Sequence, residues 1–316
     1  MTSSSTSNPE TIAAIRSELG TLVTESANMN YPDLAALGTL ELAAAMNGED
    51  ALVPAAIERQ LPTIAAIIDE IARRMRDGGR LIYVGAGTPG RMGILDASEC
   101  PPTFGTDPSL VVGVIAGGAK AVNQAVENAE DSEAAGAADM AALNLGNNDS
   151  VIGMAASGRT PYVIAAVNAA RAKGAYTVGF ACNNNSPLGA AADTALEIEV
   201  GPEFLTGSTR LKSGTCQKLV LNMISTITMV RLGKTYKNFM VDLRATNAKL
   251  RARSERTLMR ATGCDASTAA STLLETDGHL KAAILAIMTG LPASAAAALL
   301  EQNDGFLPAA ISAGTP

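Results

Sequence analysis

The fold of this chain is decided by the stretch Leu81-Ile82-Tyr83-Val84-Gly85-Ala86-Gly87-Thr88-Pro89-Gly90-Arg91. Its first four residues form an apolar run of the length of a strand, and glycines follow at once. Glycine lets the main chain turn sharply, and the free amides at the start of a following helix attract an anion. The pattern predicts a strand, a tight turn and a helix. The turn is either a phosphate cradle, formed by Gly87, Thr88, Gly90 and Arg91, or a connection without a ligand.

Four more apolar runs rich in Val and Ile follow this stretch and have the length of strands. They are residues 110–115, 151–154, 177–180 and 196–200. Helix-like segments separate them. Continuous apolar strands that alternate with helices are typical of a parallel sheet covered on both faces, in which ligands bind at the carboxyl ends of the strands. We therefore expect an α/β fold with a parallel sheet sandwiched by helices.

Both ends of the chain have helical patterns. The N-terminal pattern covers residues 11–75 and is interrupted by Pro32, Pro54 and Pro62, of which Pro62 stands where a proline opens a helix. After about Lys234 no strands are expected. A weak repeat of Leu-Leu-Glu, Asp-Gly and Ala-Ala-Ile within residues 257–311 predicts two copies of a helix, a glycine stop and a second helix. The expected organisation is an N-terminal tail and helical segment (1–60), an α/β domain (61–235) and a small helical domain (236–316).

The composition excludes several classes of protein. The 316 residues include 24 Lys or Arg, 31 Asp or Glu and a single His, His279, and the formal net charge is −7. An acidic chain without basic blocks is not a dedicated nucleic-acid binder. One His cannot build a multi-histidine metal site, so no metal ligands are expected. Acid–base chemistry must therefore rest mainly on carboxylates.

The cysteines and the hydropathy pattern indicate the compartment. The four cysteines are far apart and form no CxxC pair, which favours reduced thiols. The first ten residues lack the charged start and apolar core of a signal peptide. The longest apolar-looking stretch, residues 219–230, is too short and too polar to span a membrane and is typical of a buried helix. We expect a cytoplasmic protein without membrane contact.

A second turn rich in small polar residues follows the third strand and precedes a helix. Its residues are Ser157, Gly158, Arg159 and Thr160. Hydroxyls beside helix amides can donate to phosphate oxygens, although such a turn can also be a helix cap. Two such turns at the carboxyl ends of strands in one sheet converge, which favours phosphate binding. A third segment, residues 206–215, is either a further anion contact through Arg210 and Lys212 or a solvated helix start.

The candidate acid and base are two glutamates. Glu99 lies just after the first glycine turn and before two prolines, and Asp96 would share its helix face because the two are three residues apart. Glu130 is expected at the end of the helix that follows the second strand. Taken singly, each acid also fits a solvated surface position.

These residues lie in long stretches that resemble one family. The stretches are LIYVGAGTPGRMGILDASECPPTFG (81–105), AVENAED (125–131), AASGRTPYVIAA (155–166), VGPEFLTGSTRLKSGTCQKLVLNM (200–223), NFMVDL (238–243) and Thr246-Asn247. The chain resembles the N-acetylmuramic acid 6-phosphate etherases, bacterial enzymes built on a sugar isomerase (SIS) domain, over residues 24–311. The resemblance implies an SIS-type parallel sheet between helices, an N-terminal helical segment and a small C-terminal helical domain.

The resemblance also implies an activity. This is cleavage of the D-lactyl ether of N-acetylmuramic acid 6-phosphate by elimination and hydration, to N-acetylglucosamine 6-phosphate and D-lactate, in cell-wall sugar recycling. The family uses no metal or organic cofactor and forms homodimers. By position in the motifs, Glu99 matches the proton donor to lactate, and Glu130 matches the second active-site glutamate, in the role of base. The phosphate site is matched by Thr88, Ser157, Gly158 and Thr160, and contacts to substrate anions or a neighbouring subunit by Arg210 and Lys212.

The chain departs from the family pattern at three places. Pro89 replaces the usual serine of the first glycine turn and removes one hydroxyl and one N–H, Gly38-Thr39 replaces Ser-Thr, and Ala35 replaces an Asp. Two alternative functions follow, a non-catalytic phosphosugar-binding regulator of the SIS class and a sugar-phosphate isomerase. Because both glutamates and the Ser157 turn are present, an active etherase is the favoured interpretation.

Overall fold

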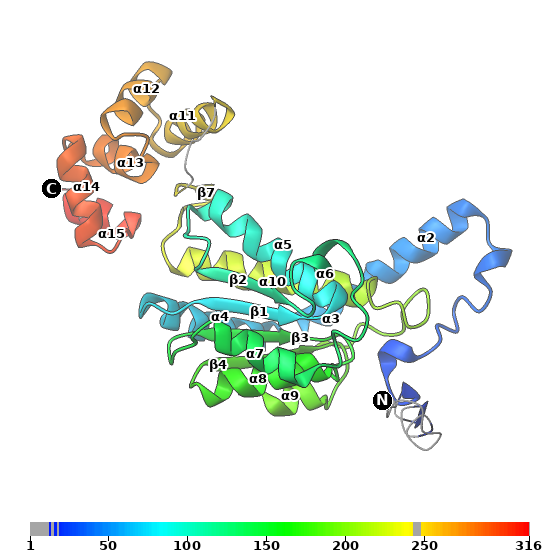
Figure 1. The fold of residues 1–316 in the computed structure, drawn as a ribbon. Coiled ribbons are helices and arrows are strands. Elements are labelled where there is room, and N and C mark those ends of the chain that lie inside the picture. Colours follow the sequence, from blue (N-terminus) through cyan, green and yellow to red (C-terminus); the bar gives the residue numbers. More distant parts are fainter. Residues whose placement is uncertain (1–12, 14–15, 18, 243–247, 316) are drawn as a thin grey trace. The chain divides into compact units, whose positions relative to one another are not determined.

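The computed structural model of the chain describes residues 13, 16–17, 19–242 and 248–315 (Figure 1). The tail expected for residues 2–8 and the motif residues Leu243, Thr246 and Asn247 lie outside the described residues. The chain forms two compact units, one of residues 1–96 and 112–224, the other of residues 97–111 and 225–316. Each unit has its own cluster of buried apolar side chains.

A five-stranded parallel sheet organises the α/β part of the chain. Its strands are β1 Leu81–Gly85, β2 Val111–Ile115, β3 Ser150–Met154, β4 Tyr176–Ala181 and β5 Thr194–Glu197, in the order β2-β1-β3-β4-β5. The first four match the predicted strands closely. The strand predicted at residues 196–200 is wrong, because the edge strand β5 runs from Thr194 to Glu197 and buries only Leu196 fully. An edge strand needs no continuous apolar run, so the pattern placed it too late.

Helices cover both faces of this sheet. Tyr83 of β1 faces α5 (Gly87–Phe104), where a Cβ added to Gly93 would lie 2.7 Å from the Cβ of Tyr83. Ile82 and Val84 point to the opposite face, because side chains alternate along a strand. They pack in one cluster with the buried stripe of α8 (Pro161–Ala172). The predicted α/β sandwich is confirmed.

Further helices complete these layers. They are α4 Leu61–Arg76, α6 Lys120–Asn123, α7 Glu133–Ala142, α9 Pro187–Ala191 and α10 Lys212–Arg231. Helix α7 packs closely on α8, because a Cβ on Gly136 would lie 2.1 Å from the carbonyl oxygen of Tyr162. Pro62 lies in the first turn of α4, as predicted. The isoleucines that follow it are buried, which gives α4 one apolar face.

The helical pattern predicted for residues 11–75 is interrupted between residues 20 and 38. Only the short 3₁₀ turns η2 Val23–Glu25 and η3 Leu34–Ala36 occur there, before α2 Thr39–Asp50 and α3 Leu52–Glu58. The side chain of Asn28 accepts a hydrogen bond from the N–H of Asn30, and that of Asp33 accepts one from the N–H of Ala35, each at 3.1 Å. Such local bonds compete with helix formation. The interruption includes Pro32, one of the predicted breaks, but it is longer than a single proline implies.

The second unit contains a helical cluster and a small hairpin. The helices are α11 Ala248–Thr262, α12 Ala266–Glu275, α13 Leu280–Thr289, α14 Ala293–Gln302 and α15 Leu307–Gly314. Strands β6 Thr235–Tyr236 and β7 Phe239–Met240 pair antiparallel. The expectation that strands end at Lys234 is therefore wrong. Two-residue strands carry too few side chains for an alternating pattern to reveal them.

The predicted internal repeat is confirmed. In the first copy α12 ends before Asp277 and Gly278, and the N–H of Gly278 donates to the carbonyl of Leu273 at 2.7 Å. In the second copy α14 ends before Asp304 and Gly305, and the N–H of Gly305 donates to the carbonyl of Leu300 at 2.9 Å. All four turn residues have positive φ, the backbone geometry that ends a helix and that glycine adopts readily.

The cysteines form no disulfide in the described residues; Cys100, Cys182 and Cys216 are buried, and Cys264 is partly buried. Within the described ranges no single helix is long and apolar enough to cross a membrane, and two pairs of helices reach that length only across a sharp bend.

Candidate functional site

The first glycine turn connects β1 to α5 through very close backbone packing. A Cβ on Gly85 would lie 2.6 Å from the amide nitrogen of Gly90, and a Cβ on Gly90 would lie 2.6 Å from a side-chain carbon of Ile115. Gly87 has a φ of 57°, which a side chain would disfavour. The amides of Gly87 and Thr88 lie at the start of the helix and have no partner within it. The turn thus presents main-chain donors, and the Thr88 hydroxyl makes no hydrogen bond in the described part of the chain.

The second turn connects β3 to α8, but its helix amides are already used. The N–H of Tyr162 donates to the carbonyl of Glu130 at 3.0 Å, and the N–H of Val163 donates to the carbonyl of Thr160 at 3.1 Å. The Ser157 hydroxyl accepts a bond from the N–H of Arg159 at 3.3 Å. The amides of Tyr162 and Val163 are thus used within the chain, and the groups of this turn that could still meet an anion include the hydroxyls of Ser157 and Thr160.

The sheet brings these two turns to the same edge. Strands β1 and β3 are adjacent and parallel, and Gly85 at the end of β1 is in register with Met154 at the end of β3. The residue after each end starts a glycine turn. The convergence of the two turns, predicted from the sequence, is confirmed. Carboxyl ends of neighbouring parallel strands are the usual place for a ligand in such folds.

Arg91 points to the loop after α6 instead of towards the turn. Its Nε donates to the carbonyl of Val122 at 2.9 Å, and its Nη2 donates to the carbonyl of Gln124 at 3.3 Å. These bonds use the Nε and Nη2 edge of the planar guanidinium. The sequence placed Arg91 among the phosphate ligands, whereas the structure ties it to main-chain carbonyls.

A cavity of about 290 Å³ lies beside the first turn. Gly87, Arg91 and Glu130 line it together with residues 124–129. Glu130 lies in a turn between α6 and α7, not at a helix end as predicted, because α6 stops at Asn123. Its exposed carboxylate and the first turn therefore share one cavity, so a group bound at the turn would lie beside a carboxylate.

The third segment does not offer its lysine to a ligand. Lys212 is 1% exposed, and its ammonium pairs with the carboxylate of Glu49, which is 6% exposed. The buried carboxylate of Glu203 accepts bonds from the N–H groups of Lys212 and Ser213 at 2.8 and 3.0 Å, and from the Ser213 hydroxyl at 2.8 Å. The start of α10 is thus capped by the chain's own carboxylate. Arg210 is exposed and is the cation of this segment that solvent can reach.

Asp96 and Glu99 lie on α5 in different environments. Asp96 is 5% exposed, and its carboxylate accepts bonds from the Tyr83 hydroxyl at 2.9 Å and from the Asn222 side chain at 2.8 Å. Glu99 is exposed. Both acids lie on α5 three residues apart and are therefore neighbours on its surface, as predicted, but only Asp96 of the two is buried. Glu99 belongs to the second compact unit and Glu130 to the first.

Sequence reasoning missed a set of hydrogen bonds that links the N-terminal segment to the second turn. The Asn183 side chain accepts a bond from the N–H of Thr24 at 3.4 Å and donates to the Thr24 hydroxyl at 2.9 Å and the Ala156 carbonyl at 3.1 Å. The polar run that follows β4 at the site edge is a signal that could have revealed it.

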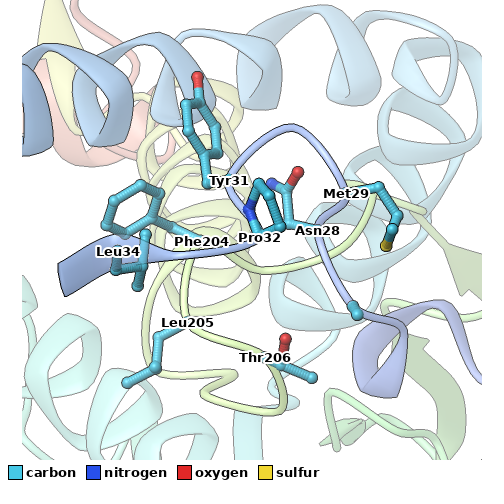
Figure 2. A pocket seen from close by; sticks show the side chains of 9 residues that line it. Asn28, Met29, Tyr31, Pro32, Leu34, Phe204, Leu205 and Thr206 are labelled. Atoms are coloured by element: carbon cyan, nitrogen blue, oxygen red, sulfur yellow. The ribbon is translucent and has the colours of Figure 1, made fainter. Parts of the chain in front are cut away.

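A second cavity of about 270 Å³ lies further along the N-terminal segment, where the rings of Tyr31 and Phe204 meet edge to face with centroids 5.3 Å apart (Figure 2).

Titration and metal binding add little to this site. Burial and the neighbouring Asp139 carboxylate raise the pKa of Tyr162, so its hydroxyl stays neutral. Among the described residues, no group of three His, Cys, Asp or Glu side chains is arranged to hold a metal ion.

Comparison with known proteins places the chain in a family. The model of the glucokinase regulatory protein N-terminal SIS domain matches residues 63–171, and the SIS domain model matches residues 118–227. An N-acetylmuramic acid 6-phosphate etherase of Streptomyces avermitilis is 59% identical over 87% of this chain and 88% of its own length. One of Vibrio atlanticus is 53% identical over 87% and 90%. A phosphoheptose isomerase structure from Neisseria gonorrhoeae has a TM-score of 0.45 at 17% identity, and covers 60% of this chain and 96% of its own. The chain belongs to the N-acetylmuramic acid 6-phosphate etherase family.

Proposed function

We propose that this chain is a lyase that cleaves the D-lactyl ether of N-acetylmuramic acid 6-phosphate and gives N-acetylglucosamine 6-phosphate and D-lactate. The observation that carries the proposal is the 59% identity to an etherase over 87% of the chain. The product sugar returns to amino-sugar metabolism in peptidoglycan recycling. The paired turns and the carboxylate beside them supply the groups that this reaction needs.

The reaction is an elimination followed by a hydration. In the open-chain sugar the C1 aldehyde acidifies the C2 proton, and the ether oxygen sits on C3, β to the carbonyl. A base removes the C2 proton, the C3–O bond breaks, and an acid protonates the departing lactate oxygen. Water then adds at C3 of the unsaturated sugar. Two carboxyl groups in different protonation states can divide this work at neutral pH.

The phosphate is held, in this proposal, by the two glycine turns. The donors are the hydroxyls of Thr88, Ser157 and Thr160 and the amides of the first turn, with Gly87, Gly90 and Gly158 allowing close approach of the main chain. Holding the phosphate makes the proton transfers effectively intramolecular. Glu130 acts as the base at C2 and Glu99 as the acid at the lactate oxygen. Arg210 is the exposed cation available to the substrate carboxylate.

A lactate assay tests the activity. The purified protein is incubated with N-acetylmuramic acid 6-phosphate, and D-lactate is measured with a coupled dehydrogenase. Glu99→Gln and Glu130→Gln should each lower kcat by about 10²–10⁴-fold, because each removes a proton-transfer group. Glu133→Gln is the matched control, since Glu133 is an exposed acid in the first turn of α7.

The same assay separates the alternative functions. If micromolar protein releases no D-lactate but binds the sugar phosphate in a calorimeter, the chain is a phosphosugar-binding regulator. If it forms a ketose phosphate without lactate, it is an isomerase. Either result overturns the etherase proposal.

We also propose a homodimer. Ile227 and Val230 on α10 are 40% and 43% exposed, whereas Val220, Leu221 and Ile224 on the same helix are fully buried. Exposed apolar residues at helical spacing are typical of an interface. Sedimentation should give twice the chain mass for the wild type, and Val230→Asp should shift the protein towards the monomer.

The proposal further places the chain in the cytoplasm and its domain boundaries near residues 60 and 235.

A further inference from the structure

The loop that carries Glu130 has little structure of its own. This Glu130 loop, residues 124–132, joins α6 to α7. Within residues 125–131 the described chain makes one hydrogen bond, from the N–H of Tyr162 to the carbonyl of Glu130. Most of these residues are exposed, and Asn128 has a φ of 60°. Ala129 packs against the core cluster and Val126 lies against Gly117, so apolar packing and the bonds that hold the two ends of the loop together position the Glu130 carboxylate.

Tyr162 holds the far end of the loop. It lies in the first turn of α8, which the second glycine turn precedes, and its side chain is fully buried. Its main-chain N–H reaches the Glu130 carbonyl at 3.0 Å. A main-chain bond to a buried helix start fixes the Glu130 backbone in relation to the second turn.

Arg91 holds the near end. Its guanidinium donates to the carbonyls of Val122 and Gln124, the last turn of α6 and the first residue of the loop. Helix α6 has only four residues, too few to be stable without outside contacts. Arg91 itself lies in the first turn of α5, next to Gly90, whose backbone is packed against Gly85 and Ile115. The arginine thus links a rigid phosphate turn to a loop that lacks internal bonds.

We infer that Arg91 is a positioning residue, which holds the Glu130 loop against the first glycine turn and does not bind the substrate phosphate. The inference rests on the proposed function for its kinetic consequences, but the bracing itself does not depend on that function. The Nε and Nη2 N–H groups on one edge of the planar guanidinium match the carbonyls of Val122 and Gln124, and the single ammonium of lysine does not reproduce this fork. An arginine is therefore required at this position.

Kinetics of Arg91→Ala and Arg91→Lys distinguish positioning from phosphate binding. Positioning predicts that kcat falls by about 10²-fold in Arg91→Ala, the scale of a 1 Å misplacement, and by less in Arg91→Lys. It predicts that three constants change by less than about threefold: KM, the inhibition constant of N-acetylglucosamine 6-phosphate and the inhibition constant of inorganic phosphate. Added guanidinium should restore part of kcat in Arg91→Ala and none in Glu130→Gln. A rise of tenfold or more in KM and in both inhibition constants, with kcat unchanged, would overturn the inference.

Hydrogen exchange provides a test that does not need turnover. Amides of residues 125–131 should exchange faster in Arg91→Ala than in the wild type, while amides of β1 and β3 keep their protection. Arg73→Ala is the matched control, because Arg73 is an exposed arginine near the end of α4. Its described ion pairs are with the nearby residues Glu70 and Asp77. If the wild type lacks etherase activity while loop exchange still accelerates in Arg91→Ala, the proposed function fails and the bracing stands. Unchanged loop exchange in Arg91→Ala and in Arg91→Lys rejects the bracing, whatever the activity.

Discussion

Gly214 of α10 lies directly against Thr88 of the first glycine turn. A Cβ on Gly214 would lie 3.3 Å from Cγ2 of Thr88 and 3.5 Å from the carbonyl oxygen of Thr209. The third segment therefore reaches the proposed phosphate site through its main chain and not through the ammonium of Lys212. The wall that α10 forms here has no room for an added methyl group unless Thr88 moves.

Gly214→Ala should weaken substrate binding more than it changes stability. The added methyl must push Thr88 by a few tenths of an ångström, because 3.3 Å is tighter than ordinary carbon contacts. We expect KM to rise about threefold to tenfold, equivalent to roughly 1 kcal/mol. Steady-state lactate release measures it. Gly48→Ala is the control, since a Cβ there would meet nothing within 4 Å and alanine favours a helix. Equal KM values in the two variants would contradict the contact.

Thr88→Val should raise KM without loss of stability. Valine keeps the methyl that touches Gly214 but removes the hydroxyl, which has no partner in the described chain. A hydrogen bond to a charged group is worth about 1.5–3 kcal/mol, so KM and the inhibition constant of inorganic phosphate should both rise about tenfold or more. Thr88→Ser, which restores the hydroxyl, should recover most of the affinity. A wild-type inhibition constant in Thr88→Val would remove Thr88 from the phosphate site.

Lys212→Met should destabilise the protein strongly, because it leaves Glu49 as a buried carboxylate without its cation. Breaking one partner of a buried pair costs about 3–5 kcal/mol. The double variant Lys212→Met with Glu49→Leu should lose less than the sum of the two single variants. Urea unfolding measures all three. Arg210→Ala should leave the unfolding midpoint nearly unchanged, because Arg210 is exposed. A stable Lys212→Met with raised KM would show instead that Lys212 serves the substrate.

Asp149 should make stability depend on acid pH. Burial opposes its ionisation, but hydrogen bonds from Arg80 and from the N–H of Gly146 outweigh burial and hold the pKa of Asp149 below its usual value. A lowered folded-state pKa gives stability that is complete above the unfolded pKa of about 4 and is lost as pH falls below it. Asp149→Asn should therefore be less stable at pH 7 and show a flatter decline below pH 4. Chemical unfolding between pH 7 and pH 3 measures this difference, and kcat at neutral pH should stay unchanged, because Asp149 precedes β3 at the amino end of the sheet.

The turns and most of the sheet were predictable because they depend on local chemistry. Apolar runs ending in glycine located β1 and β3, and parallel pairing placed their turns together. The edge strand β5 and the hairpin β6–β7 were placed wrongly or missed, since neither has a pattern that alternation or apolar content detects. The segment between residues 20 and 38 was predicted to break only at Pro32, and its full extent was missed because Asn and Asp side chains bind local amides.

The roles of the charged residues depend on contacts between segments distant in sequence. Arg91, Lys212 and Arg210 look alike in the sequence, as cations beside glycine turns. In the folded chain Arg91 donates to loop carbonyls, Lys212 pairs with Glu49, and Arg210 is exposed. Each outcome depends on whether the tertiary structure brings a partner near.

The sequence by itself determined the α/β architecture, the two glycine turns, the helical repeat and the family, because strand periodicity, glycine conformation and long motifs are properties of neighbouring residues. The tertiary structure alone decided which donors at those turns are still open and which charges are buried. A polar group forms its hydrogen bonds with whichever group the fold places within reach. That is why Glu203, and not a ligand, caps α10, and why Arg91 braces the loop that carries Glu130.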